Sequence, residues 1–257
     1  MNTIEKKMIR ILKDLKGEYG AVGVKSSLEA EGIRFTELFR LKEIAMVAGL
    51  GSTVKIGGCE ALTDIRMARS IGFDGIMSPM IESGFALKKF LDMAEAEYSK
   101  DELEDIKLLI NIETLDGYEK IDKLLAVDGI GRLYGIVLGR TDLSSALNMK
   151  DVDSPQILQI AREIFMKAKQ KSIKCMVGGG ITDKTIPFLK ELGDLVCGFE
   201  TRKVIFANVQ VNEAVMKKGI RLALEFEYLW YKLKQEFYDK LLKEDEGRMK
   251  KLAGPHI

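Results

Sequence analysis

The sequence contains few of the residues that build cross-linked or histidine-based reactive sites. Its only histidine, His256, lies in the C-terminal tail, so other side chains must carry any acid–base chemistry in the rest of the chain. The three cysteines, Cys59, Cys175 and Cys197, form no CxxC pair. This spacing predicts reduced thiols, with neither a disulfide nor a zinc site.

The sequence also lacks a charge excess and a long apolar run. Lys and Arg total 40 against 39 for Asp and Glu, so no net field would draw the protein to nucleic acid or to an anionic membrane. Charges interrupt every apolar stretch near the N-terminus, and no segment approaches the ~18 apolar residues of a spanning helix. We therefore expect a cytoplasmic protein with no nucleic-acid or membrane partner.

Short strand-like runs alternate with longer segments of helical period, which predicts βαβ units around a parallel sheet. With 257 residues, the chain is long enough for a single α/β barrel. We predict an α/β fold of the (β/α)8 TIM type, in which seven strands can be placed and the eighth cannot. The expected strands are 20–27, 52–56, 75–79, 106–112, 134–138, 173–177 and 195–199, and the expected helices are 36–48, 60–71, 83–96, 115–125, 155–170 and 184–192.

A long helix-prone tract follows the last expected strand. Residues 1–207 would form the barrel and residues 208–257 a C-terminal helical extension. A helix over about 208–252 has apolar positions such as Trp230 and Leu241, and it is longer than one barrel helix requires. Such a helix cannot easily bury its whole apolar stripe on its own barrel, so we expect a homo-oligomer that forms through it.

Polar residues follow several expected strands, at the end of the barrel where the sites of such folds lie. Glu113 and Asp142 follow neighbouring strands and could converge on one ion, for which Mg²⁺ or Mn²⁺ suits oxygen ligands. The alternative is that both acids only begin helices, where carboxylates are common. Gly178-Gly179-Gly180 could offer backbone amides to an anion, or could be an ordinary loop.

Two segments carry a family resemblance. Residues 108–149 contain IET and GRTDLS, and residues 54–83 contain VKIGG followed by MSPM. Both resemble the HpcH/HpaI aldolase and citrate lyase beta-subunit family, whose barrel binds pyruvate-type compounds. The resemblance implies that Glu113 and Asp142 hold a divalent metal, and that Lys55 stands where the family commonly has a carboxylate-binding arginine. Lysine supplies the positive charge of arginine, but it lacks the planar guanidinium that can donate two parallel hydrogen bonds to a carboxylate.

The resemblance also suggests the remaining site residues. Asn111 stands where these aldolases often have an amide, and with Ser78 and Gly179 it is a candidate substrate contact beside Lys55. Arg140 would neutralise carboxylate charge. The family's histidine base has no counterpart here, because the corresponding region, VKSSLEAEGIRF, offers Glu29 and Glu31 instead. Glu29 is our candidate for the catalytic base.

Three functions remain open at this stage. The first is a Mg²⁺- or Mn²⁺-dependent carbon–carbon lyase or aldolase that acts on a small 2-oxo acid or hydroxy acid through a pyruvate-type enolate. The second is a lyase of the citrate lyase beta kind, which acts on an acyl-CoA or acyl-carrier substrate. The third is a catalytically silent barrel that binds a metal and a 2-oxo acid.

Overall fold

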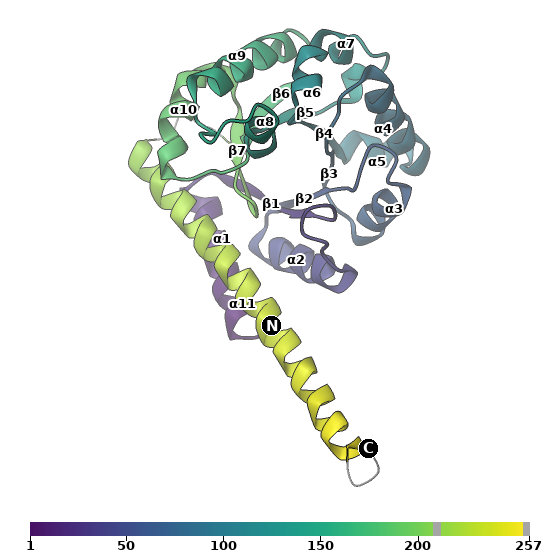
Figure 1. Ribbon diagram of the computed structural model, residues 1–257, viewed down its shortest axis with the longest axis vertical. Helices are drawn as coiled ribbons and strands as arrows, with labels where there is room; N and C mark the ends of the chain where they lie inside the picture. Colours follow the sequence, from purple (N-terminus) through teal and green to yellow (C-terminus); the bar gives the residue numbers. More distant parts are fainter. Residues whose placement is uncertain (208–211, 254–257) are drawn as a thin grey trace.

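Eight strands close into one barrel in the computed structural model, which describes residues 1–207 and 212–253 (Figure 1). Strands β1 to β7 are parallel, and each pairs with the next along the chain. The expected TIM-type barrel is therefore confirmed. The strands are β1 (Ala21–Ser27), β2 (Gly51–Lys55), β3 (Gly75–Ser78), β4 (Lys107–Ile112), β5 (Gly135–Gly139), β6 (Lys174–Gly178), β7 (Gly198–Glu200) and β8 (Val204–Ala207).

The eighth strand differs from the others in direction. β8 follows β7 after three residues and runs antiparallel to both β7 and β1. Thr201 makes this tight connection, because its backbone N–H donates to the Val204 carbonyl at 2.9 Å and its hydroxyl accepts from the Val204 N–H at 3.0 Å. No helix separates the two strands, so the alternation of strand and helix that revealed the other seven gives no signal here.

Helices surround the barrel, and most begin and end close to their expected positions. The Ser154 side chain accepts from the Ile157 N–H at 3.4 Å, and Pro155 occupies the first turn, so this helix spans the expected residues 155–170. The expected helix over 115–125 is divided at Lys120. The helices are α1 (Thr3–Glu18), α2 (Phe35–Ala48), α3 (Leu62–Ile71), α4 (Gly84–Glu97), α5 (Lys100–Asp105), α6 (Leu115–Glu119), α7 (Ile121–Leu125), α8 (Arg140–Ala146), α9 (Pro155–Gln170), α10 (Ile186–Leu192) and α11 (Glu213–Leu252).

The apolar core has two parts, because alternate strand residues face the helices and the barrel axis. The larger part fills the space between the strands and the helices. The smaller part lies on the axis and consists of Met77, Leu109, Val137, Met176 and Ile205. We call these five residues the apolar layer. The same alternation points Lys25, Lys55, Asn111 and Glu200 to the axis.

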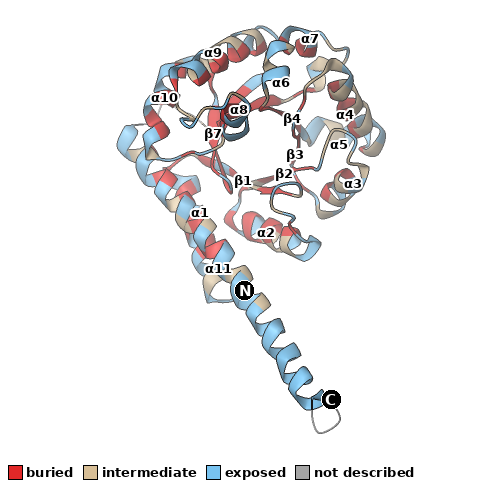
Figure 2. Cartoon of the chain, viewed as in Figure 1, coloured by how far each residue is buried: buried red, intermediate tan, exposed pale blue. Residues whose placement is uncertain are grey.

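The long C-terminal helix has two different halves. The first half of α11 packs on α1 and buries Ile220, Phe226 and Trp230, the last of which is only 1% exposed. Beyond Tyr238 the helix runs away from the barrel and is exposed (Figure 2). Trp230 is therefore buried within its own chain, and the surface that a partner could reach lies beyond it. The expected start of the helix at residue 208 falls outside the described residues.

Among residues 1–207 and 212–253, no helix combines the length and the apolar character that a membrane span requires.

Candidate active site

Glu113 is the centre of a buried polar cluster at the carboxyl end of the barrel. It follows β4 directly and is 2% exposed. Its carboxylate accepts from the Asn111 side-chain amide at 2.7 Å and from the Met80 backbone N–H at 3.1 Å. The Lys55 ammonium lies 3.2 and 3.4 Å from its two oxygens. Three donors from three strand ends therefore fix the position of this carboxylate.

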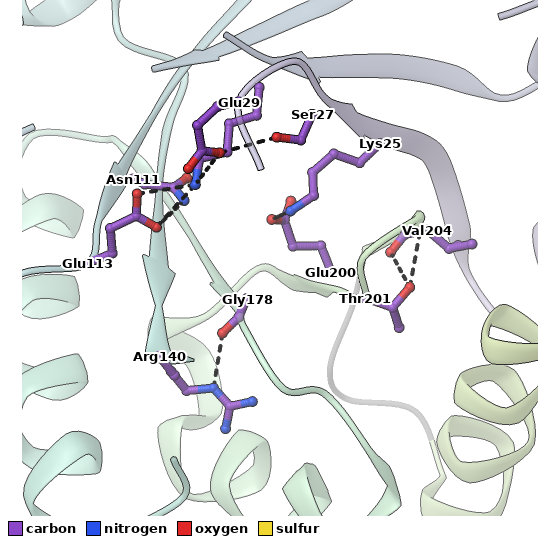
Figure 3. Close-up of polar contacts among 11 residues, drawn as sticks. Lys25, Ser27, Glu29, Asn111, Glu113, Arg140, Gly178, Glu200, Thr201 and Val204 are labelled. Atoms are coloured by element: carbon purple, nitrogen blue, oxygen red, sulfur yellow. Dashed lines mark hydrogen bonds and ion pairs between the residues drawn. The ribbon is translucent and has the colours of Figure 1, made fainter. Parts of the chain in front are cut away.

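Lys55 joins Glu113 to the loop that follows β1. Its Nζ lies 3.4 Å from Glu29 Oε2. The Ser27 hydroxyl donates to the same oxygen at 3.2 Å (Figure 3). Lys55 is only 8% exposed, so its charge is compensated by two carboxylates rather than by water. The structure thus brings three expected site residues, Lys55, Glu29 and Glu113, into direct contact.

Asp142 lies in the first turn of α8, the short helix that follows β5, and belongs to the same electrostatic cluster. Although the Asp142 residue is largely exposed, partial burial of its carboxyl raises its pKa above the ordinary value, and the nearby Glu113 carboxylate raises it further. Lys55 opposes this effect and Glu29 adds to it. Two carboxylates that repel each other in this way form a site that a cation would relieve.

Glycine on β5 allows Glu113 to adopt its position. A Cβ atom at Gly139 would lie 2.5 Å from Glu113 Oε2 and 2.7 Å from Glu113 Cβ, so no larger residue fits without moving the acid. Gly139 pairs with Gly178 on β6. Gly139 and Gly178, at the ends of β5 and β6, therefore form a surface without side chains beside the cluster. We call these two residues the glycine floor.

The donor set can be compared with the needs of a divalent metal. No group of three or more His, Cys, Asp or Glu side chains is arranged to hold an ion in the described part of the chain. Glu113 and Asp142 nevertheless share a cluster, and beside them the buried carbonyl oxygen of Asn111 accepts no hydrogen bond from any residue that the structure describes. Two carboxylates and an amide oxygen are hard ligands that suit Mg²⁺ or Mn²⁺, whose remaining positions water commonly fills. The residues present are thus compatible with such an ion.

Arg140 and Gly179 form a separate unit. The Arg140 side chain donates to the Gly178 carbonyl at 3.1 Å and to the Gly179 carbonyl at 2.6 Å, and it forms an ion pair with Asp153. Its guanidinium is fully buried and directed away from Glu113 (Figure 3). Gly179 packs against the backbone of Arg140 and Thr141, because an added Cβ would lie 2.7 Å from Thr141 N. These contacts hold the loop after β6 against the start of α8.

Ser78 and Glu31 lie apart from the cluster. Ser78 pairs with Ile110 and alternates with Met77, so it faces the helices rather than the axis. Its buried hydroxyl has no hydrogen-bond partner in the described structure. Glu31 forms an ion pair with Lys203, whose ammonium lies 5.7 Å from the Trp230 ring centroid.

Two inward-facing charged residues were not among the expected site residues. Lys25 on β1 and Glu200 on β7 form an ion pair inside the barrel (Figure 3). Strand alternation in the sequence places Lys25 on the same face as Ser27, and this signal could have identified it. Glu200 could not have been found in this way, because the expected strand 195–199 ended one residue before it.

Comparisons with known proteins support the family resemblance. Residues 53–179 match the family model described as HpcH/HpaI aldolase/citrate lyase. The matched segment carries the HpcH/HpaI pattern. It includes Lys55, Asn111, Glu113, Asp142 and Gly179, and it confirms the resemblance expected from the sequence. No curated protein sequence matched the chain.

Solved structures of two HpcH/HpaI proteins and of a citrate synthase share the fold. The HpcH/HpaI aldolase from Desulfitobacterium hafniense DCB-2 superposes with a TM-score of 0.63 at 17% identity, over 78% of this chain and 83% of that one. Citrate synthase SbnG gives a TM-score of 0.60 at 17% identity, over 87% of this chain and 89% of its own. An HpcH/HpaI aldolase/citrate lyase family protein from Burkholderia cenocepacia J2315 gives a TM-score of 0.58 at 14% identity, over 76% of this chain and 92% of that one. At these identities the likeness concerns the fold, and the family match supports a lyase or aldolase type of function.

Proposed function

We propose that this protein is a divalent-metal-dependent carbon–carbon lyase or aldolase for a small 2-oxo acid. The observation that carries the proposal is the cluster of Glu113, Asp142 and the unpartnered Asn111 carbonyl oxygen, with Lys55 beside it. Glu113 and Asp142 would hold Mg²⁺ or Mn²⁺, with Asn111 as a further oxygen ligand. Such an ion, when bound, supplies Lewis acidity that polarises the 2-oxo carbonyl.

The protein side chains would provide binding and orientation. Lys55 Nζ lies between Glu113 and Glu29 at the carboxyl end of the barrel. With Glu113 engaged by the metal, this ammonium would be available to neutralise a substrate carboxylate that enters from that end. Gly179 and Arg140 would keep the floor of the site in position, since Arg140 donates to the carbonyls of Gly178 and Gly179. Glu29 borders the site on the β1 side, where Lys55 and Ser27 hold its Oε2. It would therefore orient water or a substrate hydroxyl there, rather than act as the base expected from the sequence.

The test is the exchange of pyruvate methyl protons in deuterated water, followed by proton NMR with and without Mg²⁺ or Mn²⁺. We expect exchange in the wild type with metal, and a loss of roughly 100-fold in Asp142→Asn, the range that a displaced catalytic group can cost. Asp122→Asn is the matched control, because Asp122 is also a first-turn acid but forms an exposed ion pair with Lys167 at 2.8 Å.

The other outcomes separate the rival functions. Metal binding without exchange, detected by calorimetry, would favour a silent barrel that binds a 2-oxo acid. Exchange that is independent of metal and of Asp142 would refute the proposal. A thermal shift with CoA thioesters but not with 2-oxo acids would indicate an acyl-carrier substrate.

A further inference from the structure

Lys25 and Glu200 form a buried ion pair that has no role in the proposed function as stated above. The Glu200 side chain is 1% exposed and that of Lys25 is 14% exposed. Both residues point to the barrel axis at its carboxyl end, where Glu200 is the last residue of β7. Burying two charges is costly, and an ion pair inside a barrel gives little net stability in return. Its position, rather than its stability, therefore needs an explanation.

The glycine floor places Glu200 on the opposite side of the site from Glu113. A Cβ atom at Gly178 would lie 3.1 Å from Glu200 Oε1, just as one at Gly139 would lie 2.5 Å from Glu113 Oε2. Gly139 and Gly178 are paired residues on adjacent strands, whose spacing is about 4.8 Å. Glu113 thus leans in from β4 and Glu200 from β7, above two neighbouring glycines. A small substrate on this floor would have a carboxylate on each side.

One oxygen of Glu200 is free. Glu200 Oε1 meets Lys25, whereas the buried Oε2 accepts no hydrogen bond from any described residue. A buried carboxylate oxygen without a donor is unfavourable, and it is the kind of group that a ligand proton satisfies. Glu200 also lines a cavity of about 140 Å³ that extends along the axis toward the amino end of the barrel. Water in this cavity could exchange protons with Glu200 while a substrate covers the other side.

We propose that Glu200, held by Lys25, is the general base of this enzyme and replaces the histidine that the barrel lacks. This proposal rests on the proposed function. In cleavage of a 4-hydroxy-2-oxo acid, Glu200 Oε2 accepts the proton of the 4-hydroxyl group. The C3–C4 bond breaks, C4 becomes a carbonyl, and the bonding electron pair forms the enolate of the 2-oxo acid fragment. The same proton then moves from Glu200 to C3, so the products are pyruvate or its analogue and an aldehyde or ketone.

In this scheme one carboxylate, that of Glu200, both accepts the hydroxyl proton and donates it to C3. The overall cleavage releases and consumes no proton, so a single group that first accepts and then donates is sufficient. Lys25 is a positioning residue in this scheme. Its ammonium holds Oε1 and leaves the buried Oε2 without a hydrogen-bond donor among the described residues.

Two reactions of the same enolate test the role of Glu200. Exchange of pyruvate methyl protons requires a base, whereas decarboxylation of oxaloacetate forms the enolate by loss of CO₂ without removal of a carbon-bound proton. With Mn²⁺ present, we expect Glu200→Gln to lower the exchange rate by roughly 100-fold or more, in the range of general-base catalysis. Decarboxylation should stay within about 3-fold of the wild type, and so should the dissociation constant for pyruvate by calorimetry, since binding needs no proton transfer.

Controls separate a catalytic role from a structural one. Glu5→Gln removes the charge of another buried acid, which forms an ion pair with Arg40 at 2.6 Å outside the barrel axis, and should change neither reaction. If Glu200→Gln exchanges protons at the wild-type rate, Glu200 is not the base. If it loses both reactions and pyruvate binding equally, its role is structural and the proposal also fails. A wild type inactive in both reactions would refute the proposed function itself.

Discussion

The two ends of the barrel interior are built from different residues, although the same strands form both. At the carboxyl end the inward positions carry charged and amide groups, among them Lys25, Lys55, Asn111 and Glu200. At the amino end the cavity is lined by Gly23, Gly51 and Gly198 and also by the charged residues Asp74, Lys107 and Lys174, with the apolar layer above them. The carboxyl end carries the cluster around Glu113, at the place where the sites of such barrels lie, whereas three glycines leave a small cavity at the amino end.

Two alanine substitutions on β5 give the largest expected contrast between the ends. At the carboxyl end, Gly139→Ala forces the Glu113 carboxylate to move, because its new Cβ would lie 2.5 Å from Glu113 Oε2. We expect metal-dependent pyruvate proton exchange to fall roughly 100-fold. At the amino end, Gly135→Ala would place a Cβ 3.0 Å from the Lys174 carbonyl oxygen. It should cost about 1–3 kcal/mol of stability and leave exchange per folded molecule unchanged.

Proton NMR and urea unfolding of both variants check this contrast. Equal losses of exchange in Gly139→Ala and Gly135→Ala would show that the two ends are not functionally distinct.

The same contrast explains how much the sequence could predict. The alternation of short strand-like runs with longer segments of helical period predicts the barrel. The IET and GRTDLS segments, which follow neighbouring expected strands, predict the meeting of Glu113 with Asp142. Asp142 does share its electrostatic environment with Glu113 and Lys55. These residues lie at the ends of strands that the helical alternation marks clearly, so their shared position follows from the topology.

Residues at the β7–β8 hairpin were beyond sequence reasoning. The pairing of Lys25 with Glu200 joins positions 175 residues apart, and it depends on a short antiparallel strand that no helix precedes. The Arg140 contacts also escaped prediction, because a residue beside a site motif gives no sign of which way its side chain turns. Arg140 turns to the carbonyls of Gly178 and Gly179.

Asp74, at the amino end, should affect stability without affecting activity. Its Oδ2 accepts from Lys42 Nζ at 2.8 Å, and from the N–H and hydroxyl of Ser52 at 2.7 Å each. Burial acts to raise the pKa of Asp74, but the donors Lys42 and Ser52 outweigh this effect and hold the pKa below its ordinary value of 3.8. Asp74→Asn should cost about 1–2 kcal/mol at neutral pH, because it leaves buried donors poorly paired.

The pH dependence of this effect has a definite sign. A lowered pKa contributes stability that is present above the ordinary pKa and is lost as the pH falls through the lowered one. The difference between wild type and Asp74→Asn in thermal unfolding should therefore shrink toward acid pH. A difference that persists unchanged at low pH would contradict this account, as would a loss of proton exchange.

At the carboxyl end, substitution of Asp142 should change the stability in the opposite direction from substitution of Asp74. Burial and the Glu113 carboxylate raise the pKa of Asp142 above 3.8, so the ionised acid destabilises the metal-free protein at neutral pH. Asp142→Asn should raise the unfolding temperature by a few degrees at most. The gain should disappear as the pH falls through the raised pKa, where the wild-type acid becomes protonated.

Addition of Mn²⁺ sharpens this test, because it should stabilise the wild type more than Asp142→Asn. A variant that is less stable than the wild type in the absence of metal would contradict the proposed repulsion between the two acids.

The outer half of α11 touches neither end of the barrel, so its removal should have the smallest effect on activity. Residues from Asp239 to the end of the described helix are exposed, and they include apolar side chains such as Leu241, Leu242 and Met249. A chain that stops after Tyr238 keeps the buried Trp230 and the contact of Tyr238 with Glu37. We expect its unfolding temperature and its proton exchange to match the full chain.

Its mass in light scattering should fall to that of a smaller assembly, because an exposed apolar helix face of this kind is typical of an interface between copies. An unchanged mass would contradict the proposal of a homo-oligomer formed through this helix, and a loss of exchange would show instead that a neighbouring copy completes the charged end of the barrel.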